Sequence, residues 1–223
     1  MRTILKWTGA AIAAGTVAAT TALATGTTGS DKIEIPKYTV ERTLETFEIR
    51  EYPSRLVAEV QVTGSAKQAS NNGFRILAGF IFGGNTSQTA VDMTAPVDLR
   101  ESETIAMTAP VDRRRDGERW TVTFTMPSKY TAQTLPVPSD DRIVVRELPA
   151  KRYAAVRFSG APGERALQAR ISEFETAVSA AGIETAGSAV IYSRYDPPWT
   201  LPFLRRNELM LELPNGVDFD GRQ

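Results

Sequence analysis

Residues 49–64 read IREYPSRLVAEVQVTG, and residues 145–160 read VRELPAKRYAAVRFSG. The two stretches align without a gap and share an Arg-Glu pair, a proline, an alanine, a valine and the final glycine. Chance likeness between two β-strands is the alternative explanation, but the turn within each stretch and the helix expected after it coincide as well. We therefore predict a single domain that is built from two related halves.

Each half is predicted to begin with a strand, a tight proline-containing turn and a second strand. Leu56, Ala58, Val60 and Val62 alternate with polar residues, as expected for a strand with one buried face, and residues 153–158 alternate in the same way. Two further strands are predicted to close each half, over residues 104–111, 120–126, 189–194 and 208–213.

One helix is expected in each half. Ser65 and Gln68 have the spacing of a capping box, and the first helix is predicted to continue to about Phe82, before two glycines. The second helix is predicted to start near Pro162 and to end at Gly182. It carries one apolar stripe: Leu167, Ile171, Phe174 and Val178. The predicted fold class is therefore α+β, a pseudo-two-fold, distorted antiparallel β-barrel or sheet with two helices.

The composition excludes several kinds of chemistry. The 223 residues include 26 Lys and Arg against 26 Asp and Glu, so the sequence lacks the basic surface that a nucleic-acid partner requires. The sequence contains no cysteine and therefore offers no disulfide and no thiolate nucleophile. It contains no histidine, which excludes a Ser-His-Asp triad and a histidine-ligated zinc or iron within this chain.

The N-terminus has the layout of a secretory signal peptide. Arg2 and Lys6 precede a charge-free run rich in Ala and Thr, and residues 22–24 form a small-x-small cleavage site. The alternative is an uncleaved membrane anchor, for which the run is long enough. We expect a signal peptide or anchor over residues 1–24, a flexible leader over 25–36, the folded domain over 37–214 and a tail over 215–223. An exported protein, periplasmic or secreted, follows from this expectation.

A short motif occurs twice, as DMTAPVD in residues 92–98 and as AMTAPVD in residues 106–112. Proline removes one backbone donor and favours an extended residue before it, so each copy suits an edge strand or the entry to a loop. A local duplication that makes a β-hairpin is the simplest explanation of the pair.

The arrangement of motifs resembles the SOUL family of haem-binding proteins, and its bacterial members in particular. A helix end FRILAGFIFGGN (residues 74–85) precedes MTAPV (93–97), and FTMP (124–127) and YDPP (195–198) followed by RRNE (205–208) appear in the family's order. The resemblance extends from about Tyr38 to Leu213. It implies a domain that binds haem or another porphyrin, with a distorted β-barrel and two helices.

The resemblance also implies where haem would not be held. Some family members are described as ligating iron through a histidine in an E-(I/V)-R-H-Y stretch, and Glu51 stands at that position here. A carboxylate is a poor haem ligand, so we interpret Glu51 as a surface residue paired with Arg50 or Arg55. Four methionines are alternative ligands, but a core position is expected for each of them: Met93, Met107, Met126 and Met210.

Other family members bind haem in an apolar groove beside the first helix, with basic side chains for the propionates. The C-terminal half of the first predicted helix is apolar on more than one face, so it needs a cover besides the sheet. A planar ligand, the 85–97 loop and a partner chain are the three alternatives. Arg75 is the cation best placed for a carboxylate. The candidate haem-contacting residues are Arg75, Ile76, Gly79, Phe80, Phe82 and Met93.

Two charged segments are interpreted as structural. Residues 113–117 (RRRDG) are predicted to be a charged hairpin turn, and residues 195–198 with 206–208 are predicted to form a loop closed by bonds from side chains to backbone.

The leading hypothesis for function is binding of haem or another hydrophobic small molecule, for sequestration, buffering or transport, without histidine ligation. The first alternative is an enzyme that acts on a small apolar or tetrapyrrole-like substrate through Glu51, Asp92 or Glu208. The second is an envelope interaction domain that has lost haem binding.

Overall fold

The structure is a computed structural model that describes residues 33–88, 102–187 and 189–214. The expected signal peptide, most of the leader, the first MTAPV copy with Met93, and the C-terminal tail lie outside the described residues. The elements in chain order are β1 (Thr39–Thr43), β2 (Glu48–Tyr52), β3 (Arg55–Val62), α1 (Ala66–Ile81), β4 (Asn85–Thr86), β5 (Val111–Asp116), β6 (Arg119–Thr125), β7 (Val137–Pro138), β8 (Ile143–Leu148), β9 (Lys151–Ser159), α2 (Glu164–Ala180), β10 (Ile191–Arg194), a short 3-10 helix η1 (Pro202–Leu204) and β11 (Arg206–Glu212).

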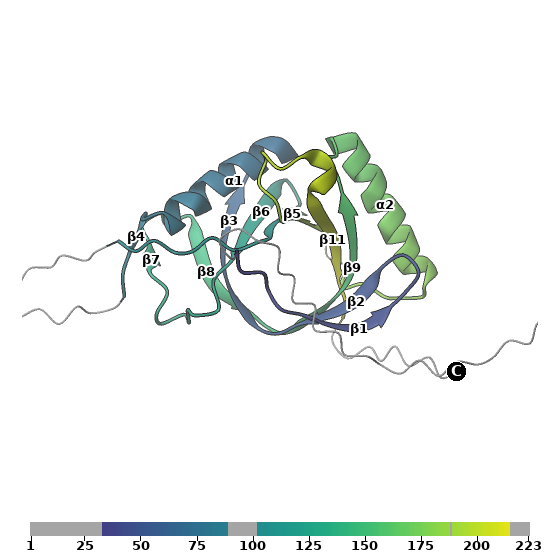
Figure 1. Cartoon of the computed structure of the whole chain (residues 1–223), viewed down its shortest axis with the longest axis horizontal. Helices are drawn as coiled ribbons and strands as arrows, with labels where there is room; N and C mark the ends of the chain where they lie inside the picture. Colours follow the sequence, from purple (N-terminus) through teal and green to yellow (C-terminus); the bar gives the residue numbers. More distant parts are fainter. Residues whose placement is uncertain (1–32, 89–101, 188, 215–223) are drawn as a thin grey trace, which may run out of the picture.

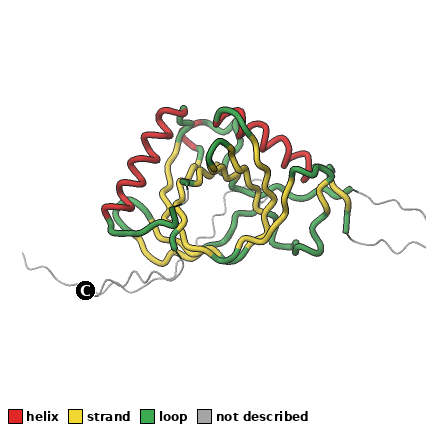
Figure 2. Tube along the Cα trace, turned by 180° about the vertical axis from the view of Figure 1, so that it is seen from behind, coloured by secondary structure: helices red, strands yellow, loops and turns green. Residues whose placement is uncertain are grey.

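Nine strands form one antiparallel sheet in the order β1-β2-β9-β11-β10-β5-β6-β3-β8. Apart from β1, the order is pseudo-symmetric about the contact between β5 and β10. Moving outward from that contact, β10, β11, β9 and β2 on one side correspond to β5, β6, β3 and β8 on the other. The sheet curls into a half-barrel, and both helices lie on its outer side (Figures 1 and 2). The α+β fold predicted from the sequence is confirmed.

The two aligned stretches occupy equivalent places in this sheet, one as β2 and β3 and the other as β8 and β9. They do not form hairpins, because β2 pairs with β9 and β3 pairs with β8. Each proline turn, at Pro53 and at Pro149, therefore carries the chain from one half of the sheet to the other.

Each helix covers its own half of the sheet. The four residues of the predicted stripe on α2 face the sheet, and three of them are buried: Leu167, Phe174 and Val178. The buried face of α1 meets Val60 and Phe124 through Leu77 and Phe80. Gly73 permits this approach, because a Cβ at that position would lie 2.5 Å from Val122 Cγ2.

The two helices begin differently. On α1 the predicted capping box is present: Ser65 Oγ accepts from the Gln68 backbone N–H at 3.4 Å, and Gln68 Oε1 accepts from the Ser65 backbone N–H at 2.9 Å. On α2 the first helical residue is Glu164, two residues after the predicted start at Pro162, and Gly163 makes no side-chain cap. Among the described residues, neither helix is long and apolar enough to cross a membrane.

Two predictions of secondary structure are wrong. The segment 104–110 forms only isolated bridges at Thr104 and Thr108, and the strand begins at Val111, after the second MTAPV copy. The charged segment 113–116 belongs to β5, and only Gly117 and Glu118 form the turn. Arginines continue a strand here because Arg113 has partners: its Nη1 donates to Ala66 O and Ser70 Oγ at 2.9 and 2.8 Å.

Candidate functional site

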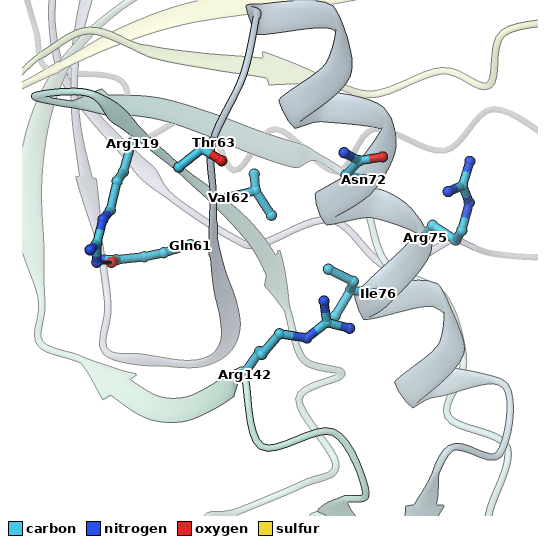
Figure 3. Close-up of a pocket in the computed structure, with 8 residues that line it drawn as sticks. All are labelled: Gln61, Val62, Thr63, Asn72, Arg75, Ile76, Arg119 and Arg142. Atoms are coloured by element: carbon cyan, nitrogen blue, oxygen red, sulfur yellow. Dashed lines mark hydrogen bonds between the residues drawn. The ribbon is translucent and has the colours of Figure 1, made fainter.

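A cleft of about 560 Å³ lies beside α1, next to the C-terminal end of β3 (Figure 3). Its size is within the range of about 300–1,000 Å³ that is usual for small-molecule sites. One wall comes from the helix, and the others come from β3, the start of β6 and the segment before β8. The lining residues are Gln61, Val62, Thr63, Asn72, Arg75, Ile76, Arg119 and Arg142.

Three arginines line this cleft, and they differ in how far they are already neutralised. Arg142 is held by Asp140 through two bonds, at 2.9 and 2.6 Å, which lower the pKa of that carboxyl to about 2. Arg119 only donates to the neutral Gln61 Oε1, at 3.2 Å. The side chain of Arg75 is exposed and makes no hydrogen bond or ion pair with another described residue. Arg75 and Arg119 are therefore available to an anionic group.

Four of the six predicted contact residues lie on one exposed flank of α1. Arg75, Gly79 and Phe82 are spaced i, i+4 and i+7, so they follow one line along the helix, and Ile76 lies beside them. Phe82 is 64% exposed, and a Cβ added at Gly79 would meet no atom within 4 Å. The flank is therefore open and partly apolar, as a planar ligand requires.

Phe80 was predicted to contact haem, but the structure places it in the core. It is 1% exposed and packs in the core with Ala58 and Val60, because it lies on the sheet-facing side of α1. Met126 and Met210 are also buried, as expected for core residues, and Met107 is partly buried.

The glycine-rich end of α1 has a structural explanation. Gly83 has a φ of +110°, and a Cβ on Gly84 would lie 2.7 Å from Gly79 O. Asn85 is buried, and its amide donates to Phe80 O at 2.7 Å and to Glu103 O at 2.8 Å. This motif therefore fixes the end of the helix and leaves the flank of Gly79 and Phe82 uncovered by its own loop as far as the described residues extend.

A buried ion network is the feature that sequence reasoning missed. Glu208 has no exposed surface and accepts from Arg50 Nη1 at 2.8 Å, from Arg206 Nη2 at 2.7 Å and from the Tyr195 hydroxyl at 2.8 Å. Arg50 also binds Glu48 at 2.8 Å. Burial, together with the Glu208 carboxylate, raises the pKa of Tyr195 well above its usual value.

The expected role of Glu51 is confirmed in one respect and wrong in another. Glu51 is exposed, as predicted, but Arg50 binds Glu48 and Glu208 instead, and Arg55 lies over the rings of Tyr52 and Tyr153. The loop predicted from residues 195–198 with 206–208 does close through side-chain-to-backbone bonds, since Asp196 accepts from the Arg206 N–H at 2.6 Å. Asp92 lies outside the described residues.

The sequence singled out Arg75 and Ile76 but not the other lining residues of the cleft. Gln61, Thr63, Arg119 and Arg142 come from strand ends and turns that are far apart in the chain, and no local pattern marks them. Among the residues that the structure describes, no cluster of three or more acidic side chains could hold a metal ion.

Comparison with known proteins points to one family. The family model described as SOUL heme-binding protein matches residues 33–212. Heme-binding protein 1 of Sus scrofa is 30% identical over 133 residues, a match that covers 59% of this chain and 65% of that protein.

Solved structures add the fold alone. The C-terminal domain of EcmrR has a TM-score of 0.55 at 11% identity, with 77% of this chain and 99% of that chain covered. EcmrR in a complex with DNA, determined by cryo-electron microscopy, has a TM-score of 0.51 at 13% identity over 74% of this chain and 57% of that chain. At this identity the likeness concerns the curled sheet with its helices.

Proposed function

Because the chain belongs to the SOUL haem-binding protein family, we propose that it binds haem or a related tetrapyrrole beside α1, without a histidine ligand to the iron. One observation carries the proposal: the cleft is lined by two unneutralised arginines, and the helix that forms one of its walls continues into the open, partly apolar flank of Gly79 and Phe82. The chain supplies no histidine or cysteine, so we expect the iron to be weakly coordinated at most and the affinity to be dominated by contacts to the porphyrin itself.

The chemistry of a porphyrin matches these residues. Its carboxylates accept charge-assisted hydrogen bonds, and Arg75 and Arg119 are the donors available for them. Its apolar ring gains free energy when it covers Ile76, Gly79 and Phe82, at roughly 25 cal/mol per Å² of apolar surface removed from water. The open space above Gly79 lets a flat ring approach the helix backbone.

The proposed role is to sequester, buffer or carry the tetrapyrrole outside the cytoplasm. The charge-free segment behind Arg2 and Lys6 supports export, because it has the order of regions of a signal peptide. Among the carboxylates of the enzyme hypothesis, Glu208 is enclosed by its ion partners and Glu51 faces solvent, so neither faces the α1 cleft.

The proposal is tested by titrating the purified chain with haem and following its absorption spectrum. The double variant Arg75→Glu, Arg119→Glu is expected to weaken binding by about a hundredfold or more, since each of the two charge-assisted bonds contributes roughly 1.5–3 kcal/mol. Phe82→Ser is expected to weaken it further. Arg165→Glu, an exposed position on α2, is the matched control and should leave the affinity unchanged.

Failure has a clear signature in the same titration. If the wild-type chain gives only the spectrum of free haem, or if the double variant binds as tightly as the control, the proposed site is wrong.

A further inference from the structure

The concave face of the half-barrel carries charged and polar side chains across its central strands. Glu59, Thr123, Asp112, Ser193 and Glu208 are direct cross-strand partners, so they form one polar row across β3, β6, β5, β10 and β11. Thr123 Oγ1 donates to Glu59 Oε1 at 3.1 Å, and Ser193 Oγ donates to Asp112 Oδ1 at 2.6 Å. The opposite, helix-covered face of the same strands carries the apolar core.

A cavity of about 290 Å³ opens on this row. It is separate from the α1 cleft and shares no lining residue with it. Its apolar wall consists of Leu148, Tyr153 and Ile191, and its cations are Arg55, Arg114, Arg146 and Lys151.

Two of these cations are already paired, and two are not. Arg146 Nε binds Glu59 Oε2 at 2.6 Å, and Lys151 binds Glu212. The side chain of Arg114 makes no hydrogen bond or ion pair with any described residue. The side chain of Arg55 also forms no ion pair in the described part of the chain, and its Nη1 is buried with no hydrogen-bond partner. Buried donors without partners are rare in folded proteins and call for an explanation.

Asp112 is the remaining charged residue of the cavity. Burial raises the pKa of its carboxyl to about 6, against the effect of the Ser193 hydrogen bond and of Arg55. A carboxyl with that pKa is mainly ionised at pH 7, so Asp112 offsets one of the two unpaired cations and leaves the other. The unpaired charge in the cavity is therefore positive.

We propose that this cavity is a second binding site, for a small organic monocarboxylate with an apolar or aromatic body. Arg55 and Arg114 would receive the carboxylate, which gives the buried Nη1 of Arg55 its missing partner. Tyr153, Leu148 and Ile191 contact the body. Asp112 favours a carboxylate with one charge over a phosphate, because an acid beside the bound anion repels a second negative charge.

The test uses benzoate as the probe and isothermal titration calorimetry of the whole chain as the measurement. Benzoate is expected to bind saturably, and benzamide, which has the same shape without the charge, is expected to bind about tenfold more weakly or not at all. Arg114→Gln and Arg55→Gln should each weaken benzoate by about tenfold, whereas Arg165→Gln should not change it.

Arg114→Gln keeps the test clear of misfolding, because Arg114 supports no other described residue through a hydrogen bond or ion pair. The same variant should bind haem as the wild type does. The proposal is overturned if benzoate gives no saturable heat, if benzamide binds equally well, if Arg114→Gln retains full affinity for benzoate, or if it loses haem and benzoate together.

Discussion

Glu208 lies at one end of the polar row, with a carboxylate that is wholly removed from water. Taking such a charge out of water is costly, and two arginines and a tyrosine offset that cost here. The consequence is an asymmetry: the intact network contributes little net stability, whereas removal of one member leaves the others buried and unpaired.

Glu208→Gln is therefore expected to lower the free energy of unfolding by about 3–5 kcal/mol, because Arg50 loses its main acidic partner inside the sheet. Urea denaturation measures the change. Glu51→Gln, exposed on the same strand as Arg50, is the matched control and should stay within about 0.5 kcal/mol of the wild type. A Glu208 variant as stable as this control would show that the network is not maintained in solution.

Asp112 predicts a dependence of stability on pH. Its pKa in the folded protein is about 6, above the ordinary value of 3.8, so the folded state binds this proton more tightly than the unfolded state. The stability that this group contributes is complete below pH 3.8 and is lost as the pH rises through about 6.

Asp112→Asn removes this titration while keeping an acceptor for Ser193. The variant should gain stability relative to the wild type between pH 4 and pH 7, by up to about 2 kcal/mol, since part of the carboxyl still faces the cavity. Urea denaturation at several pH values measures the difference. A constant difference across this range would contradict the buried position of the carboxyl.

At the scale of single elements, the sequence predicted best where local rules decide. The capping box at Ser65 and the stripe on α2 depend on spacing along one helix, and both are present. The strand expected from residue 104 is wrong, because backbone bonds in this segment go to a helix end: the Ile105 N–H donates to Ile81 O at 2.8 Å.

The charged strand β5 could not be predicted from its own residues. Arg113 to Asp116 have the composition of an exposed turn, and only the partners on α1 and β6 explain a strand there. In the same way, Arg50 and Glu208 are 158 residues apart in the sequence. Their pairing follows from the order of strands, in which β2, β9 and β11 are neighbours.

The candidate site shows the same limit. Arg75 and Ile76 were predicted because they lie in a helix whose apolar residues exceed one face. Phe80 was assigned to that surface as well, but the structure places it in the core. Which face of α1 packs against the sheet depends on the close approach of Gly73 to Val122, and these two residues are far apart in the chain.

At the scale of the whole molecule, the sheet separates two environments. The outer face carries the helices (Figure 1), with the α1 cleft beside the first of them, and the concave face carries the polar row and its cavity. The two proposals therefore assign different chemistry to the two places, a broad flat ligand with peripheral carboxylates to the α1 cleft and a small carboxylate to the concave cavity. The family assignment supports haem binding as such.

The central claim is that porphyrin affinity comes from apolar contact and arginines, not from a ligand on the iron. It is tested most directly by comparing haem with iron-free protoporphyrin through quenching of tryptophan fluorescence in the purified chain. We expect two dissociation constants within about threefold of each other, because the chain offers no histidine or cysteine to the metal and any coordination by other residues should be weak. A preference for haem of about thirtyfold or more, equivalent to roughly 2 kcal/mol from the iron, would contradict it.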